Sequence, residues 1–338
     1  MAASSASGKS TVAKKVTILG VCVVAAIGLY TGGWYFAAEK IKEKTLELIA
    51  GGPDAPVTAT CRDAEMRGYP FRLGLFCSGV NVDDHRNGVS ASFGALRSAA
   101  QVYDPQHIVW ELDQPATIHS SDGLSLSSEW SNLQSSVQLD GGRLLRSALV
   151  VDDARTSIAH PLLPEGLKLN AKHGEMHLRR NGMDLDAALS LDALDAVLGN
   201  GRNLPPLDLR ADVTVVDGAA LLQGGGDLAG HQAELRKLSA DLGEGRTFTV
   251  SGPLSVDEEG YLSGRLKVEV AGIEQWRAAL KAAAPEADKT IDTAINMLTA
   301  LVSGGDTVSV DLVLQKGKVL AGGFIPVAKL PPLFPPRQ

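Results

Sequence analysis

The sequence has no run of lysine and arginine after its first fifty residues. Its 338 residues carry a formal net charge of −7, and the pI is near 5.5. Binding to nucleic acid needs a basic face that neutralises phosphates. The arginines in "GGRLLR" (Arg143 and Arg146) and the pair Arg179–Arg180 are isolated and are interpreted as solvated strand or turn positions. The composition therefore argues against nucleic acid as a partner.

The sequence also lacks a recognisable catalytic motif. No G-x-S-x-G elbow is present. The stretch Gly224–Gly230, "GGGDLAG", has the wrong glycine spacing for a phosphate loop and no following Lys-Ser/Thr, so it is interpreted as a turn. "VDEEG", Val256–Gly260, has too few oxygen ligands for a calcium loop and is predicted to be a hairpin turn. We predict a protein that is not an enzyme and uses no cofactor.

Cysteine is scarce, with three residues, and no second Cys or His pair stands near Cys61 and Cys77 at the spacing of a zinc site. "HGEMH" places His173 and His177 four residues apart with Glu175 between them. On a helix this spacing suits zinc, but the flanking residues predict a strand, where residues four apart are about 13 Å distant. No metal site is predicted.

Charge is absent from one long stretch, Val16–Phe36, of about the length that crosses a hydrocarbon core as a helix. Trp34, Tyr35 and Phe36 close it, as in an aromatic belt. The stretch is longer than the apolar region of a signal peptide, no A-x-A cleavage site follows, and it is apolar on all sides rather than on one face. We predict a transmembrane anchor over residues 16–36, after a tail over residues 1–15.

Two of the cysteines, Cys61 and Cys77, bracket a segment with Gly68, Tyr69 and Pro70 in its middle. If the flanking segments are strands folded about Tyr69, both cysteines lie on the apolar side and face each other, with Gly68 and Pro70 forming the turn. A disulfide here would contribute about 3 kcal/mol. The alternative is two buried free thiols.

The orientation of the anchor depends on these cysteines, because the basic residues on its two sides are equal in number. A disulfide persists in an oxidising compartment. We therefore expect a single-pass protein of the bacterial inner membrane, with its N-terminus in the cytoplasm and its bulk in the periplasm.

From Val57 onward the chain reads as short strands and tight turns, with Asn-Gly or Asp-Gly at several turns. We predict a mainly β (β-rich α+β) fold, either a curved antiparallel sheet or two stacked β-rich halves. The expected divisions are a helix and linker over residues 37–56, a first β-rich part over 57–200, and a second part with two helices over 201–338. The helices are expected in "GIEQWRAALKAAA" and "PEADKTIDTAINMLTALVSGG", and a weaker one at Ser190–Gly199.

Two stretches are similar to one known family. They are "CRDAEMRGYPFRLGLFCSGV" (Cys61–Val80) and "VSVDLVLQKGKVLAGGFIPVAKLPPL" (Val308–Leu333). With the anchor, the chain resembles the alphaproteobacterial family catalogued as domain of unknown function 2125, over most of its length after the anchor. The resemblance implies a single-pass inner-membrane protein with a periplasmic β-rich body, and a strand rather than a helix in "HQAELRKLSADL". It supplies no site residues.

The strand pattern is also similar, more distantly, to the AsmA-like envelope proteins, whose curved sheets carry an apolar trough and are associated with phospholipid traffic. The first hypothesis is therefore a periplasmic protein that binds phospholipid or another apolar ligand, in envelope maintenance or lipid transport. The alternative is an envelope scaffolding module that acts through protein partners at an exposed patch or sheet edge. The residues that would bind a ligand are not predicted.

Overall fold

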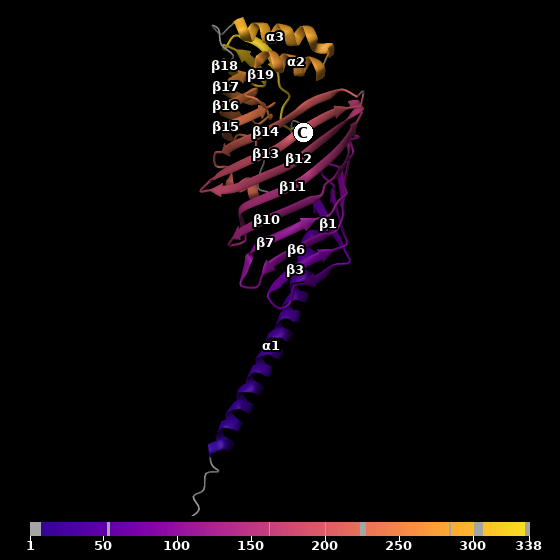
Figure 1. Ribbon diagram of the computed structural model, residues 1–338, viewed down its shortest axis with the longest axis vertical. Helices are drawn as coiled ribbons and strands as arrows, with labels where there is room; N and C mark the ends of the chain where they lie inside the picture. Colours follow the sequence, from indigo (N-terminus) through magenta and orange to yellow (C-terminus); the bar gives the residue numbers. More distant parts are fainter. Residues whose placement is uncertain are drawn as a thin grey trace, which may run out of the picture.

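The computed structural model describes residues 8–52, 55–161, 163–199, 201–223, 228–283, 285–300 and 307–334. One long helix, α1 (Gly8–Ala50), leads out of a large β body, and two short helices lie at the far end of that body (Figure 1). The predicted anchor and the following helical segment form this single helix, which ends at Gly51 in the left-handed conformation that favours glycine. Its most apolar 18-residue window is entirely exposed, and it is the one described helix long and apolar enough to span a membrane.

The described strands form one twenty-stranded antiparallel sheet that is not closed. Its N-terminal part consists of two sets of strands that both pair with the long strand β11 (Arg143–His160). The first set, in spatial order, is β2 (Glu65–Arg67), β3 (Arg72–Cys77), β6 (Leu96–Gln101), β7 (Asp104–Leu112) and β10 (Asn132–Asp140). The second is β1 (Val57–Arg62), β4 (Gly79–Asp84), β5 (Val89–Phe93), β8 (Ala116–Ser120) and β9 (Ser125–Glu129).

A line of bends separates the two sets. Wherever the chain passes from one set to the other, as from β3 to β4 or from β7 to β8, only one to three residues connect the two strands. At one bend a Cβ on Gly94 would lie 2.5 Å from the carbonyl oxygen of Asp113, so the close approach requires glycine. At another the indole of Trp130 is buried and donates to the carbonyl of Leu112 at 2.8 Å. In β11 the bend falls at Asp153, which has a φ of 51°. The aligned bends fold the sheet along a line across its strands.

Beyond β11 the sheet continues strand by strand in sequence order to the C-terminus, as a ladder of antiparallel neighbours. These strands are β12 (Leu163–Asn181), β13 (Asp184–Leu198), β14 (Asn203–Val215), β15 (Gln232–Asp241), β16 (Thr247–Val256), β17 (Leu262–Ala271), β18 (Thr307–Gln315), β19 (Lys318–Ala321) and β20 (Ile325–Lys329). The strand expected in "HQAELRKLSADL" is β15, and β16 and β17 form the hairpin expected around the acidic turn.

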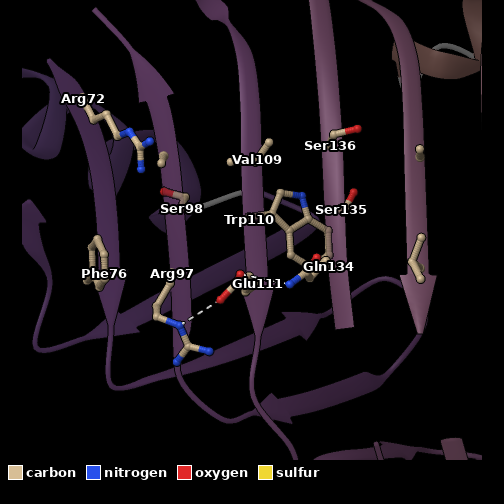
Figure 2. A pocket seen from close by; sticks show the side chains of 13 residues that line it. Arg72, Phe76, Arg97, Ser98, Val109, Trp110, Glu111, Gln134, Ser135 and Ser136 are labelled. Atoms are coloured by element: carbon tan, nitrogen blue, oxygen red, sulfur yellow. Dashed lines mark hydrogen bonds and ion pairs between the residues drawn. The ribbon is translucent and has the colours of Figure 1, made fainter. Parts of the chain in front are cut away.

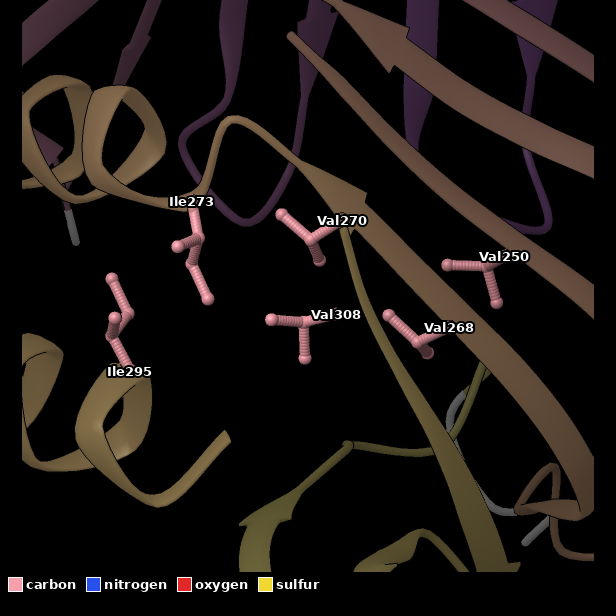
Figure 3. Close-up of a cluster of buried hydrophobic side chains, with 6 residues drawn as sticks. All are labelled: Val250, Val268, Val270, Ile273, Ile295 and Val308. Carbon is pink, nitrogen blue, oxygen red and sulfur yellow. The ribbon is translucent and has the colours of Figure 1, made fainter. Parts of the chain in front are cut away.

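Two predicted helices are confirmed as α2 (Ile273–Ala283) and α3 (Asp288–Ala300), which follows the short 3-10 turn η2 (Pro285–Ala287). A second 3-10 turn, η1 (Gly218–Gln223), follows β14. Ile273 and Ile295 of the two α-helices are buried against valines of β16, β17 and β18 (Figure 3). The helices therefore cover one face of the C-terminal end of the sheet, and these buried residues form a hydrophobic core there.

The helix expected at Ser190–Gly199 is wrong, because this segment belongs to β13. Ala193 has a φ of 48°, its backbone N–H donates to Asp208 Oδ1 at 2.8 Å, and the pairing with β14 shifts register beside it. Such a bulge inserts one extra residue into the alternation. It places Leu191 and Leu194 three positions apart, a spacing that is typical of a helix.

Both expected β-rich parts lie in this one sheet, because β13 pairs with β14 on either side of residue 200. The sheet is the curved antiparallel alternative of the predicted fold class rather than two stacked halves. The boundary placed near residue 200 stays a prediction.

Candidate binding surface

Alternation along the strands places an apolar row across the middle of the sheet. Leu149 of β11 is opposite Met176 of β12, which is opposite Leu189 of β13. The row continues through Ala211 of β14 and Leu238 of β15 to Val250, Val268 and Val310 of the next three strands. A parallel row contains Val151, Leu191 and Leu209. One face of the sheet is therefore apolar from β11 to β18.

The two ends of this apolar face differ in what covers them. Val250, Val268 and Val310 are each 8% exposed, at the end of the sheet that α2 and α3 cover. In the middle of the sheet, Met176 is 38% exposed and Leu189 is 36% exposed, while Leu149 and Val151 are half-buried. Large apolar side chains at neighbouring positions are normally buried in a packed core. The middle of the face is therefore partly exposed to solvent, and we call the residues Leu149, Val151, Met176, Leu189 and Leu191 the open apolar face.

The short turn η1 sets one limit of the open apolar face. Ala219 of η1 is buried, and its backbone N–H donates to the carbonyl of Met183 at 2.9 Å. A Cβ on Gly218 would lie 2.7 Å from the side chain of Val215 and 3.3 Å from that of Leu185. Both of these side chains are buried. The turn thus covers the apolar side at the β12–β13 hairpin end and leaves Met176 and Leu189 exposed.

The opposite face of the same strands is polar and its charges are paired. Asp186 of β13 is buried, and it accepts hydrogen bonds from Arg179 at 2.7 Å, from the hydroxyl of Thr214 at 2.8 Å and from Arg236 at 3.3 Å. The hydrogen bond from Arg179 is the largest cause that lowers the pKa of Asp186 to about 2. Arg236 also pairs with Asp212. The two arginines of this network are exposed while Asp186 is buried, and the apolar side chains of these strands lie on the other face.

The histidines of "HGEMH" lie on this polar face, on a strand as predicted. Glu175 bonds both of them, His173 Nε2 at 3.0 Å and His177 Nε2 at 3.0 Å, and His173 Nδ1 is 2.6 Å from Asp152 Oδ1. The hydrogen bond with Glu175 is the largest cause that raises the pKa of His173. Over the residues that the structure describes, no group of three or more His, Cys, Asp or Glu side chains is arranged to hold a metal ion.

A pocket of about 520 Å³ lies nearer α1, over β3, β6, β7, β10 and β11 (Figure 2). Arg97 in its wall pairs with Glu111 at 3.3 Å and with Asp113 at 2.6 Å. Arg72, also in the wall, has no carboxylate or side-chain hydrogen-bond partner among the described residues, and it is exposed. The wall mixes these charges with Phe76, Val109 and Val150. The pocket has the residues to hold an anionic or polar group at Arg72.

The predicted cysteine pair forms a disulfide between β1 and β3, with a Cα–Cα distance of 5.2 Å. The expected hairpin is wrong, however, because β1 pairs with β4 and β3 pairs with β2 and β6. Asp63, with a φ of 51°, turns the chain out of β1 before β2 begins. The disulfide thus joins one strand from each set across the line of bends. The third cysteine, Cys22, is free and exposed on α1.

The predicted turn residues Gly68, Tyr69 and Pro70 do form a turn. Gly68 has a φ of 114°, and its carbonyl accepts from the N–H of Arg72 at 2.9 Å. The turn lies against α1, where the Tyr69 ring contacts the rings of Tyr30, Trp34 and Tyr35. These residues are far from the open apolar face in the strand order. The glycine-rich stretch at Gly224–Gly230 lies partly outside the described residues.

A family model described as "uncharacterized protein conserved in bacteria" (DUF2125) matches residues 34–331. The chain belongs to this family. No curated protein and no solved structure matches it. The match covers every described strand, from β1 to β20, and begins within α1.

Sequence reasoning did not find the residues of the open apolar face of this DUF2125 protein. The histidines of "LKLNAKHGEMHLRR" were considered as metal ligands, but they lie on the polar face. Met176, which stands between them in the sequence, lies on the apolar face. The bulge at Ala193 hid the strand that carries Leu189 and Leu191. The alternation of β12 and β13 was the available signal, but alternation alone does not reveal which apolar face stays uncovered.

Proposed function

We propose that this family member is a membrane-anchored envelope protein, without enzymatic activity, that holds acyl chains of lipids on its open apolar face. The observation that carries the proposal is the continuous apolar row that is buried under α2 and α3 at one end and about one-third exposed at Met176 and Leu189. An apolar chain laid across these residues would remove their surface from water, worth about 0.8 kcal/mol for each buried CH₂ group.

Two further features support a location. The apolar part of α1 anchors the chain in a membrane, and the disulfide between Cys61 and Cys77 suits an oxidising compartment. Together they favour a bacterial inner-membrane protein with a cytoplasmic N-terminus and a periplasmic body. There the open apolar face serves envelope maintenance or lipid transport.

Photocrosslinking in cells tests the proposal with a control one residue away. A photoreactive benzoylphenylalanine replaces Leu189 or Met176 of the full-length protein, and in the control it replaces Ser190. Because side chains alternate along a strand, position 190 faces the polar side of the same sheet. Cells grown with radiolabelled phosphate are irradiated, and the purified protein is examined for labelled phospholipid adducts.

We expect labelled adducts at positions 189 and 176 and none at position 190. Equal labelling at position 190, or no lipid adduct at 189 and 176, would overturn the proposal. A discrete protein adduct at 189 in place of lipid would favour the scaffolding alternative, in which the open apolar face docks an envelope protein.

A further inference from the structure

Two turns of the body lie beside each other, and the first of them contacts α1. The first is the turn Gly68–Arg72, which leads into β3, and the second is the turn Val102–Tyr103 between β6 and β7. The backbone N–H of Val102 donates to the carbonyl of Phe71 at 3.0 Å. The two turns are therefore held together at the same end of the sheet.

The first of these turns is bound tightly to α1. The hydroxyl of Tyr30 donates to the carbonyl of Pro70 at 2.5 Å, and Thr31 Oγ1 is 2.7 Å from the hydroxyl of Tyr69. The indole of Trp34 donates to the carbonyl of Arg72 at 3.2 Å. The Tyr69 ring also stacks on Tyr35 at a centroid distance of 5.8 Å. These contacts fix the depth of the turn relative to the helix.

That depth lies within the apolar segment that sequence assigns to the membrane. Tyr30, Thr31 and Trp34 all belong to residues 16–36, and with a rise of 1.5 Å per residue Tyr30 lies about 9 Å closer to the membrane centre than Phe36. Because the turn contacts Tyr30 and Thr31, it lies alongside the last two turns of the span. A body fixed there meets the interfacial layer of lipid.

The side chains that these turns present suit that layer. Phe71 is 67% exposed and Tyr103 is 77% exposed, with Val102 half as exposed as Tyr103 at 39%. Aromatic side chains are enriched at the interface, where an apolar ring meets the headgroups. Beside them the guanidinium of Arg72 has no carboxylate partner in the described part of the chain, and such a cation suits lipid phosphate.

We propose that the turns Gly68–Arg72 and Val102–Tyr103 form a second membrane contact, with Phe71 and Tyr103 inserted into the interface of the bilayer that α1 spans. Two contacts, the helix and these turns, hold the sheet at a fixed tilt, whereas a single helix leaves the body free to lean. The first strands of the sheet then stand on the membrane, and α2 and α3 lie at the end away from it (Figure 1). This inference does not depend on the proposed binding of acyl chains.

Site-directed fluorescence on the full-length protein in phosphatidylcholine–phosphatidylglycerol bilayers tests the contact. Cys22 is replaced by serine, so that a single new cysteine, Tyr103→Cys or Phe71→Cys, carries the polarity-sensitive dye NBD. The matched control is Phe324→Cys, because Phe324 is 76% exposed and also lies in a turn. It is ten strand steps from β7, or about 48 Å along the sheet.

We expect NBD at positions 103 and 71 to emit at shorter wavelength than NBD at position 324, and to lose intensity when lipids with a doxyl quencher are included. Emission at 103 and 71 that matches position 324, without quenching, overturns the proposal, as does a response at only one of the two positions. Retention of the Cys61–Cys77 disulfide on a non-reducing gel shows that each variant is folded.

Discussion

Asp186 offers the sharpest test of what stabilises the sheet. Its side chain is 9% exposed on the polar face of β13, where Arg179, Thr214 and Arg236 all donate to it. Replacing Asp186 by asparagine keeps the shape but removes the charge that these groups surround. Arg179 then loses the carboxylate with which it pairs, and Arg236 keeps only its pair with Asp212.

The magnitude follows from the pKa of Asp186, which is lowered from 3.8 to about 2. That difference corresponds to about 2.4 kcal/mol of stability when the carboxyl is charged. Arg179 is 66% exposed, so solvent screens its share of the interaction. We expect Asp186→Asn to lower the free energy of unfolding by about 1–2 kcal/mol at pH 7.

The dependence on pH has a definite sign. A carboxyl whose pKa is lowered by folding contributes stability that is complete above its unfolded pKa, near 3.8, and is lost as the pH falls through about 2. The difference between wild type and Asp186→Asn is therefore expected to be constant from pH 7 to pH 5 and to shrink between pH 4 and pH 2. Urea unfolding of the full-length protein in detergent, followed by circular dichroism, measures it at each pH.

A matched control is Asp212→Asn, because Asp212 also pairs with Arg236 but its side chain is 44% exposed. We expect this control to change the free energy of unfolding by less than about 1 kcal/mol. Equal losses for Asp186→Asn and Asp212→Asn, or a difference between wild type and Asp186→Asn that persists undiminished at pH 2, would refute the reasoning.

Two further predictions concern the region near α1. Replacing Cys61 and Cys77 together by alanine opens a loop with a sequence separation of 16, so the free energy of unfolding in urea should fall by about 3 kcal/mol; an unchanged unfolding midpoint would show that the cross-link adds nothing. Gly74→Ala should cost about 1–3 kcal/mol, because its Cβ would lie 1.9 Å from the carbonyl oxygen of Ser98. Gly52→Ala is the control, because no other described residue apart from its chain neighbours has an atom within 4 Å of the added Cβ, and equal midpoints for the two variants would contradict the steric account.

Local patterns predicted the elements of this protein where a single segment contains the whole signal. The uncharged run and the helix after it became α1, and the start and stop residues around α2 and α3 marked those helices. The cysteine pair was also recognised, because both residues lie at the ends of short alternating segments. Strand β13 was not predicted over its second half, because the bulge at Ala193 changes the spacing of its leucines to one that is typical of a helix.

The sequence by itself determined the long apolar helix, the strand-rich body, the two C-terminal helices and the cysteines that pair, because hydrophobic period and length are properties of one segment. Only the tertiary structure decided that β1 pairs with β4, that the sheet folds along its line of bends, and that the turn at Tyr69 docks on Tyr30. It also decided which part of one apolar face stays open at Met176 and Leu189. Alternation gives a strand an apolar side, but exposure depends on what packs against that side, and those contacts join residues far apart in the chain.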